Sequence, residues 1–195
     1  MINSSNQDSY STQPLSIDTI SVGALSLQQL PTSGKLILRG KPNDNAFTNR
    51  VSQLLECELP IKVNTVVTSK IGTVMWRGPD EWMIELSLDQ VDSLQTDLIA
   101  ILENQHINIV VVTDAYSVLR LSGQGAPDVL SSGCSLNLNK SEFGTDQCAQ
   151  THYHKIGIAL RFVDETPTFD IFVRRSETEY LWRHLELACQ TNAPH

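Results

Sequence analysis

Clusters of basic residues are missing from this sequence. Its 14 lysines and arginines are dispersed and are outnumbered by 22 aspartates and glutamates, which gives a formal net charge of −8. Binding to nucleic acids or to anionic membranes depends on clustered Lys and Arg. Long apolar runs are missing too, because the longest, around residues 107–112, is far below the roughly 20 residues of a membrane span. We therefore expect neither a nucleic acid nor a membrane as a partner.

The N-terminal segment has neither the basic region nor the apolar core of a secretory signal. Residues 1–14 are polar and are predicted to form a disordered tail, and residues 191–195 a second tail. The cysteines are scattered and lack any C-x-x-C spacing, which is typical of free thiols in a reducing cytosol. The sequence therefore predicts a cytoplasmic protein. The cysteines are Cys57, Cys134, Cys148 and Cys189.

Sequence signatures of catalysis are also absent. The chain contains no G-x-G-x-x-G, no G-x-x-x-x-G-K-[ST] and no H-E-x-x-H motif. It also lacks the G-x-S-x-G of a nucleophile elbow. Gly123 and Gly125 are a lone pair of glycines before a helical pattern, which is too little to define a phosphate site. The residues alone favour a binding or assembly domain over an enzyme, and we assign no catalytic residue.

What the sequence does contain is a layout repeated in two halves, at about 33–105 and 106–190. Each half has a short apolar strand that ends on glycine, at residues 36–40 and 119–123, followed by a helical pattern, further strands and a second helix. This order predicts an α+β fold of duplicated ferredoxin-like subdomains with antiparallel sheets, whose helices cover one face. We expect residues 15–190 to form a single compact domain.

Apolar residues at helical spacing mark the predicted helices. An extra strand is expected at residues 107–112, where we place the start of the second half. Ser176 and Glu179 have the spacing of a capping box that opens the last helix. The apolar stripes are Phe47, Val51, Leu54 and Leu55, then Leu94, Leu98, Ile101 and Leu102, then Ala126, Val129 and Leu130, and finally Leu181, His184, Leu185 and Ala188.

Residues 76–82 read Trp-Arg-Gly-Pro-Asp-Glu-Trp and hold two of the three tryptophans. Gly-Pro marks a turn, and the residues on either side alternate as in half-buried strands, so we predict a hairpin. Two interpretations stay open. The tryptophans pack in the core, or the tip is a binding surface, because Trp and Arg are enriched at the centres of protein interfaces. The candidate interface residues are Trp76, Arg77, Asp80 and Trp82.

Two histidines form a His-x-His pair, His152 and His154. On a strand this spacing places both rings on one face, where neutral imidazoles can share a zinc ion. The same face continues through a row of apolar residues, and no further ligand lies nearby in the sequence. We therefore take two partly buried histidines as the default and metal binding as the alternative.

Three charged residues lie at strand ends and are weak candidates for ligand contacts. Asp114 follows the strand at 107–112, and aspartate at such a position is either a ligand-binding group or a turn residue. Arg39 and Arg120 end the two matching strands of the repeat. Either they bind one anion together, or each serves a local carbonyl group.

Several motifs, in the same order, resemble the gamma subunit of heterotetrameric sarcosine oxidase. Residues 76–82 are similar to the W-x-G-P-D-E-W signature of that family, and residues 119–123 to its L-R-L-S-G strand. Residues 129–138 resemble its V-L-x-x-G-C-P-L-D-L stretch, with serine and asparagine in place of proline and aspartate. The resemblance spans about residues 36–186. The remaining matches are Phe143 with residues 148–151, then residues 167–169, 173–176 and 180–182.

This resemblance implies a subunit of an assembly that oxidises sarcosine to glycine, releases hydrogen peroxide and passes the one-carbon unit to tetrahydrofolate. It implies that FAD, NAD and covalently attached FMN lie on the alpha and beta subunits and zinc on the delta subunit. This chain would hold no cofactor and would pack chiefly against the alpha subunit. The implied fold is that of the folate-binding domain of the glycine-cleavage T-protein, a duplication of ferredoxin-like units.

Two other functions remain open. A stand-alone folate-binding protein of the T-protein type would need a pocket between the two halves with an acid to hold the pterin, and Asp114 is the candidate. A small metal-dependent enzyme would be built on His152 and His154.

Overall fold

The structure is a computed structural model that describes residues 19–103, 105–139 and 142–192. The tail predicted at residues 1–14 lies outside the described residues. In the tail predicted at 191–195, the first two residues belong instead to the last turn of α4, Thr178–Asn192.

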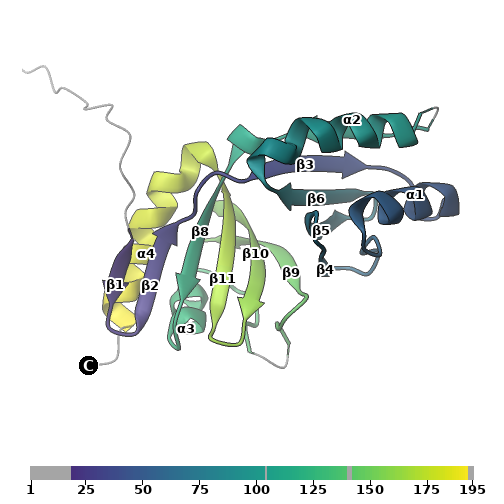
Figure 1. Cartoon of the computed structure of the whole chain (residues 1–195). Coiled ribbons are helices and arrows are strands. Elements are labelled where there is room, and N and C mark those ends of the chain that lie inside the picture. The colour runs from purple at the N-terminus through teal and green to yellow at the C-terminus, as the bar shows by residue number, and fades with distance from the viewer. Residues whose placement is uncertain (1–18, 104, 140–141, 193–195) are drawn as a thin grey trace, which may run out of the picture.

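One of the two antiparallel sheets comes from the first half of the chain (Figure 1). It has five strands in the order β4-β5-β6-β3-β7. In β3, the leucines Leu36 and Leu38 lie on the helix-covered face, and Lys35 and Ile37 lie on the opposite face. The strands are β3 (Gly34–Arg39), β4 (Val66–Thr68), β5 (Gly72–Gly78), β6 (Glu81–Leu86) and β7 (Asn108–Val111).

The other sheet has six strands in the order β1-β2-β8-β11-β10-β9. Its core strands alternate in the same way, so that Leu119 and Leu121 lie on the helix side and Val118 on the opposite face. The strands are β1 (Ile20–Val22), β2 (Leu25–Gln29), β8 (Tyr116–Ser122), β9 (Cys148–Tyr153), β10 (Ile156–Asp164) and β11 (Thr168–Arg174).

The two sheets repeat one topology. In the first, β3, β5, β6 and β7 are adjacent in the order β5-β6-β3-β7, with α1 after β3 and α2 after β6. In the second, the order β10-β11-β8-β2 is equivalent, with α3 after β8 and α4 after β11. This is the ferredoxin-like arrangement twice, with β1, β4 and β9 as added edge strands. The predicted α+β fold with two antiparallel sheets is confirmed.

The halves divide differently from the sequence-based boundary. The strand expected at 107–112 is β7, which we assigned to the second half, but it pairs with β3 in the five-stranded sheet. The fourth strand of the second unit is instead β2, near the N-terminus, which pairs with β8. The sequence analysis did not predict β1 and β2. It assigned each strand to the half in which it lies along the chain, and β2 shows that a strand can join the sheet of the other half.

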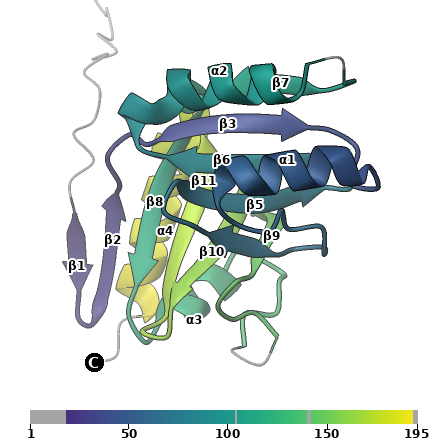
Figure 2. The ribbon, with the colours of Figure 1, turned by 45° about the vertical axis from the view of Figure 1, so that its right-hand side comes forward.

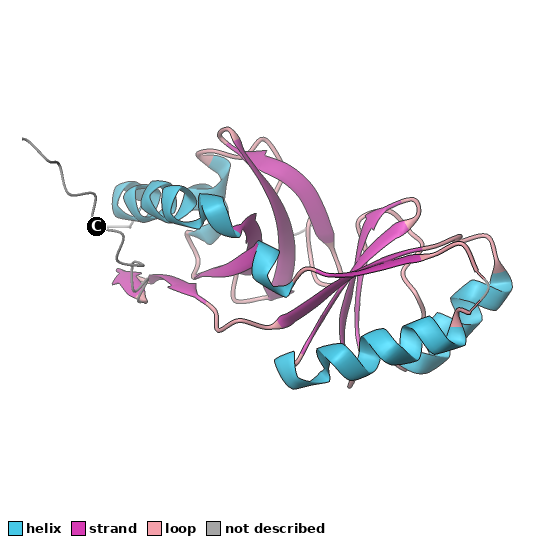
Figure 3. Cartoon of the chain, turned by 90° about the horizontal axis from the view of Figure 1, so that it is seen from above, coloured by secondary structure: helices cyan, strands magenta, loops and turns pink. Residues whose placement is uncertain are grey.

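Each sheet carries its helices on one face (Figure 3). Helices α1 (Asn45–Leu55) and α2 (Val91–Ile101) cover the five-stranded sheet, and α3 (Ala126–Ser131) and α4 cover the six-stranded one. Helix α1 begins where the Asp44 carboxylate accepts a hydrogen bond from the Ala46 amide at 2.9 Å, which satisfies a donor at the helix start. Ser176 does not cap the last helix as predicted, because it lies in the 3-10 turn Arg175–Glu177 before α4, and the Glu179 carboxylate accepts from Arg183 at 2.6 Å.

The faces of the two sheets that carry no helix, here called the inner faces, pack against each other. Strands of the two sheets run across one another (Figures 1 and 2). At one edge the sheets are also joined by backbone hydrogen bonds, from Val66 N to Asp146 O and from Cys148 N to Asn64 O, both 2.9 Å. The small apolar cluster between the inner faces consists of Val66, Met75, Met83, Val118, Cys148 and Phe172.

Candidate functional site

The predicted hairpin is formed by β5 and β6, and one of its tryptophans is part of the core. Trp82 has no exposed surface, and its ring lies 5.7 Å from the ring of Phe47 on α1. Its indole N–H donates to the carbonyl oxygen of Pro60 at 2.7 Å. Trp82 therefore holds α1 and the loop around Pro60 against the sheet, which is the core interpretation that the sequence left open.

The other hairpin residues differ in exposure. Trp76 is half-buried, and Asp80 is exposed at the tip beside Pro79. Arg77 points to the inner face, where its guanidinium lies 5.4 Å from the ring of Tyr116 on β8. Asp80 and part of Trp76 are thus the surface that the hairpin offers to another molecule. Contact with a partner at this hairpin stays a prediction.

A buried carboxylate connects strands of the six-stranded sheet on its inner face. Asp170 on β11 has no exposed surface, and both of its oxygens accept hydrogen bonds from Arg120 on β8, at 2.7 and 3.0 Å. Arg161 on β10 donates to the same carboxylate. The second terminal nitrogen of Arg161 lies 2.8 Å from Glu85 on β6, in the five-stranded sheet. This network ties the two sheets together by charge as well as by apolar contact.

The network continues into the five-stranded sheet through a buried lysine. Lys35 is 1% exposed, and its ammonium donates to the hydroxyl of Ser33 at 2.8 Å, which in turn donates to Glu85 at 2.7 Å. Burial lowers the pKa of Lys35, and the negative charge of Glu85 partly opposes that shift. Of the residues in this network, the sequence analysis named only Arg120; Lys35, Glu85, Arg161 and Asp170 were missed, although an aspartate within the apolar strand 168–174 is a signal that could have found Asp170.

The three weak ligand candidates do not form a common site. Arg120 is occupied by Asp170. Arg39 lies in the other sheet, with its Nε 2.8 Å from a carboxylate oxygen of Glu81. Asp114 is exposed in a short turn after β7 and lies 3.4 Å from Arg175. Each arginine that we considered for a shared anion site therefore has a carboxylate partner of its own.

The two histidines lie on the surface and not at the end of a core row. His152 is exposed on β9, and His154 is exposed in the turn between β9 and β10, with a φ of 53°. The turn breaks the alternation that we extended through it, so Tyr153 faces the core instead. The His154 ring lies 5.2 Å from that of His184 on α4. In the described residues, no three His, Cys, Asp or Glu side chains come together as a metal site would require.

Two cysteine thiols are held in the protonated form. Burial raises the pKa of Cys148 to about 11, as it does for Cys189. The Cys148 sulfur donates to the carbonyl oxygen of Trp76 at 3.4 Å. Nucleophilic cysteines need a lowered pKa, so these two thiols have the properties of core residues.

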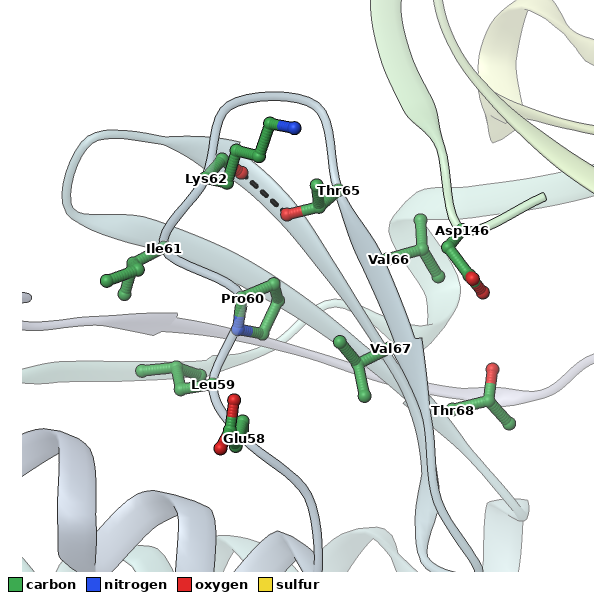
Figure 4. A pocket seen from close by; sticks show the side chains of 10 residues that line it. All are labelled: Glu58, Leu59, Pro60, Ile61, Lys62, Thr65, Val66, Val67, Thr68 and Asp146. Carbon is green, nitrogen blue, oxygen red and sulfur yellow. Dashed lines mark hydrogen bonds between the residues drawn. The ribbon is translucent and has the colours of Figure 1, made fainter. Parts of the chain in front are cut away.

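A groove of about 530 Å³ lies between strand β4 and the loop at residues 58–65 (Figure 4). Pro60 and Leu59 line the loop side, and Val66 and Val67 line the strand side. The loop also exposes two aliphatic side chains, Ile61 and Val63. The hydrogen bond from Trp82 to Pro60 attaches this loop to the hairpin. The buried part of the hairpin therefore positions one wall of the groove.

Comparison with known proteins identifies the family. The sequence model of the sarcosine oxidase, gamma subunit family matches residues 39–191. The chain belongs to this family. It is 28% identical over 159 residues to the sarcosine oxidase subunit gamma of Corynebacterium sp. (strain P-1), covering 81% of this chain and 76% of that one. It is 29% identical to the subunit gamma of Arthrobacter sp, covering 71% and 67%.

Two solved structures share the fold. The heterotetrameric sarcosine oxidase from Corynebacterium sp. U-96 contains a chain that matches with a TM-score of 0.81 and 23% identity, over 91% of this chain and 90% of that one. The glycine cleavage system aminomethyltransferase T from Bartonella henselae matches with a TM-score of 0.60 and 14% identity. That match covers 86% of this chain and 49% of the aminomethyltransferase. The predicted T-protein-like fold is confirmed.

Proposed function

We propose that this chain is the gamma subunit of a heterotetrameric sarcosine oxidase. The proposal rests on the family match over residues 39–191. The reaction we assign to the assembly is the oxidation of sarcosine to glycine, with release of hydrogen peroxide and transfer of the one-carbon unit to tetrahydrofolate. We place the complex in the cytoplasm. None of the helices in the described part of this chain is long and apolar enough to cross a membrane.

Within the assembly, we assign this chain a supporting role without catalytic residues. Its buried charges serve internal contacts: Asp170 and Glu85 neutralise Arg120 and Arg161 across the two sheets. The thiols of Cys148 and Cys189 are protonated, because burial raises the pKa of each to about 11. We assign FAD, NAD, FMN and zinc to the alpha, beta and delta subunits. We expect the contact of this chain to be chiefly with alpha.

The hairpin tip is our candidate for that contact, because Asp80 is exposed and Trp76 is half-buried. The double variant Trp76→Ala with Asp80→Lys should weaken co-purification of the larger subunits without unfolding the chain. Asp89→Lys, at another exposed position, is the matched control. Undiminished capture by the double variant would exclude the hairpin as the contact and leave the gamma-subunit assignment intact.

Affinity capture of the tagged, full-length chain from cells that grow on sarcosine tests the assignment itself. We expect larger subunits to co-purify with the wild-type chain. A chain recovered alone would contradict the proposal. The folate-binding alternative lacks support from Asp114, whose side chain is 89% exposed and so is not enclosed between the halves.

A further inference from the structure

The guanidinium of Arg77 is largely buried and has fewer acceptors than donors. Its side chain is 14% exposed, and among the described residues its Nε and Nη1 have no hydrogen-bond partner. A carboxylate oxygen of Glu81 lies 3.6 Å from Nε, which is longer than a hydrogen bond. Nη2 donates to the amide oxygen of Gln150 at 3.3 Å. A buried cation in this state is stabilised by an added anion.

The other ion-paired arginines show how unusual this arrangement is within the molecule. In each of them, a guanidinium nitrogen lies within 3.4 Å of a carboxylate oxygen. Arg174, near Arg77, has no such partner among the described residues. The paired arginines are Arg39, Arg120, Arg161, Arg175 and Arg183.

A cavity of about 310 Å³ adjoins Arg77 on the inner face of the six-stranded sheet. Tyr116 and Phe172 supply aromatic walls. Strand register places Arg174 opposite Tyr116 and His152 opposite Gly157, and all four residues line the cavity. Space remains at Gly157, where an added Cβ would meet nothing within 4 Å. Two arginines, Arg77 and Arg174, therefore lie at a partly aromatic space in a chain whose net charge is −8.

Gln150 occupies the position that an anion would take. Its amide oxygen accepts from Nη2 of Arg77, and its amide nitrogen donates to the Arg77 carbonyl oxygen. The Gln150 side chain belongs to an exposed residue, so it can rotate into solvent without disturbing the core. Its departure would free Nη2, which together with Nη1 forms the two-donor edge that carboxylates bind.

We propose that this cavity is a carboxylate-binding site in which the ligand replaces the Gln150 amide at the Nη1 and Nη2 edge of Arg77. Arg174 supplies a second positive charge at the cavity wall, and His152 supplies an imidazole. A carboxylate presents two oxygens in one plane, which can accept from the two donors at this edge of the planar guanidinium. The aromatic walls suit a ligand with a flat apolar body. The site lies within one chain, so its test does not depend on the proposed assembly.

Isothermal titration of the full-length chain with benzoate, and with the neutral isostere benzamide, tests the site. We expect benzoate to bind and benzamide to bind at least about tenfold more weakly, since charge-assisted hydrogen bonds contribute about 1.5–3 kcal/mol. Arg77→Gln should weaken benzoate binding about tenfold or more. Arg183→Gln, which removes an exposed arginine on α4, should leave it unchanged.

Gln150→Ala keeps the proposal testable if the Arg77 variant does not fold. Removal of the competing amide should tighten benzoate binding, by roughly threefold for one weak hydrogen bond. Equal affinities for benzoate and benzamide would overturn the proposal, as would an absence of benzoate binding or weaker binding in Gln150→Ala. Tighter binding of inorganic phosphate than of benzoate would overturn the assignment to carboxylates.

Discussion

Among single residues, Asp170 lies at the centre of the buried charge network that joins the two sheets. Its carboxylate is fully buried and accepts from Arg120 and from Arg161, which also reaches Glu85 in the other sheet. Burial of a charge is unfavourable unless partners surround it. The gain from such a network depends on all of its members, since removal of one leaves uncompensated charge in the interior.

Asp170→Asn should therefore lower the free energy of unfolding by about 3–5 kcal/mol, because two arginines lose their shared counter-ion. Chemical denaturation followed by circular dichroism measures the change. Arg183→Ala, which removes the exposed pair with Glu179, should cost less than about 0.5 kcal/mol. Equal effects of the two substitutions would show that the Asp170 network does not stabilise the fold.

The thiol of Cys148 predicts a loss of stability at alkaline pH. Its pKa is raised to about 11 in the folded state because it is buried, against an ordinary value of 9.0. The folded state thus retains the proton longer than the unfolded state. The stabilisation is complete below pH 9 and is lost as the pH rises through 11, with a magnitude of about 3 kcal/mol.

Cys148→Ala should make the decline of the denaturation midpoint between pH 9 and 11 shallower than in the wild type. Cys189 has the same shift and keeps part of the decline. The lowered pKa of Lys35 acts in the opposite direction. The folded protein loses the Lys35 proton at a lower pH than the unfolded chain, so the folded state gains relative stability as the pH rises toward 10.5. An unchanged slope in Cys148→Ala would contradict the thiol as a cause.

Sequence reasoning was uneven at individual side chains. It predicted the hairpin and left the burial of its tryptophans open. The histidine pair was misplaced, because the turn at His154 reverses the chain within the row that we extended. Arg77 shows the limit most clearly: its partner Gln150 lies 73 positions away, and nothing local to either residue indicates that they meet.

Among the elements, β2 is the one on which the second unit most depends. After α4 the described chain has no further strand, so β2 takes the fourth position beside β8. Leu25 and Leu27 from this strand are nearly fully buried in the core under α3 and α4. A strand near the N-terminus thus completes a sheet whose other core strands come from the C-terminal half.

Leu27→Ala should lower the free energy of unfolding by about 2–5 kcal/mol, as do other large-to-small substitutions in cores. Gln29→Ala, at an exposed position of the same strand, should change it by less than about 0.5 kcal/mol. Thermal or urea denaturation distinguishes these outcomes. If Leu27→Ala left the free energy of unfolding unchanged, β2 would not be part of the folded core.

Helices were easier to predict than strand partners. The stripe of Phe47, Val51 and Leu55 faces the sheet in α1, because a period of 3.6 residues is a local property. The sequence of a strand near a sheet edge does not indicate which strand it pairs with. Residues 107–112 were identified as a strand. Their pairing with β3 depends on where α2, which precedes them in the chain, places the start of β7.

For the whole molecule, the two ferredoxin-like units are joined by both apolar and charged contacts. Met75 and Met83 meet Val118 and Phe172 between the inner faces, and Arg161 reaches Glu85 across them. The arrangement of the two units therefore depends on an interface as well as on the segments that connect them.

The most direct test of this account is the absorbance spectrum of the complex captured with the tagged chain. We predict a yellow eluate with flavin bands, containing larger subunits and consuming sarcosine with production of hydrogen peroxide. A colourless eluate that contains the chain alone, from cells that are growing on sarcosine, would contradict the central claim.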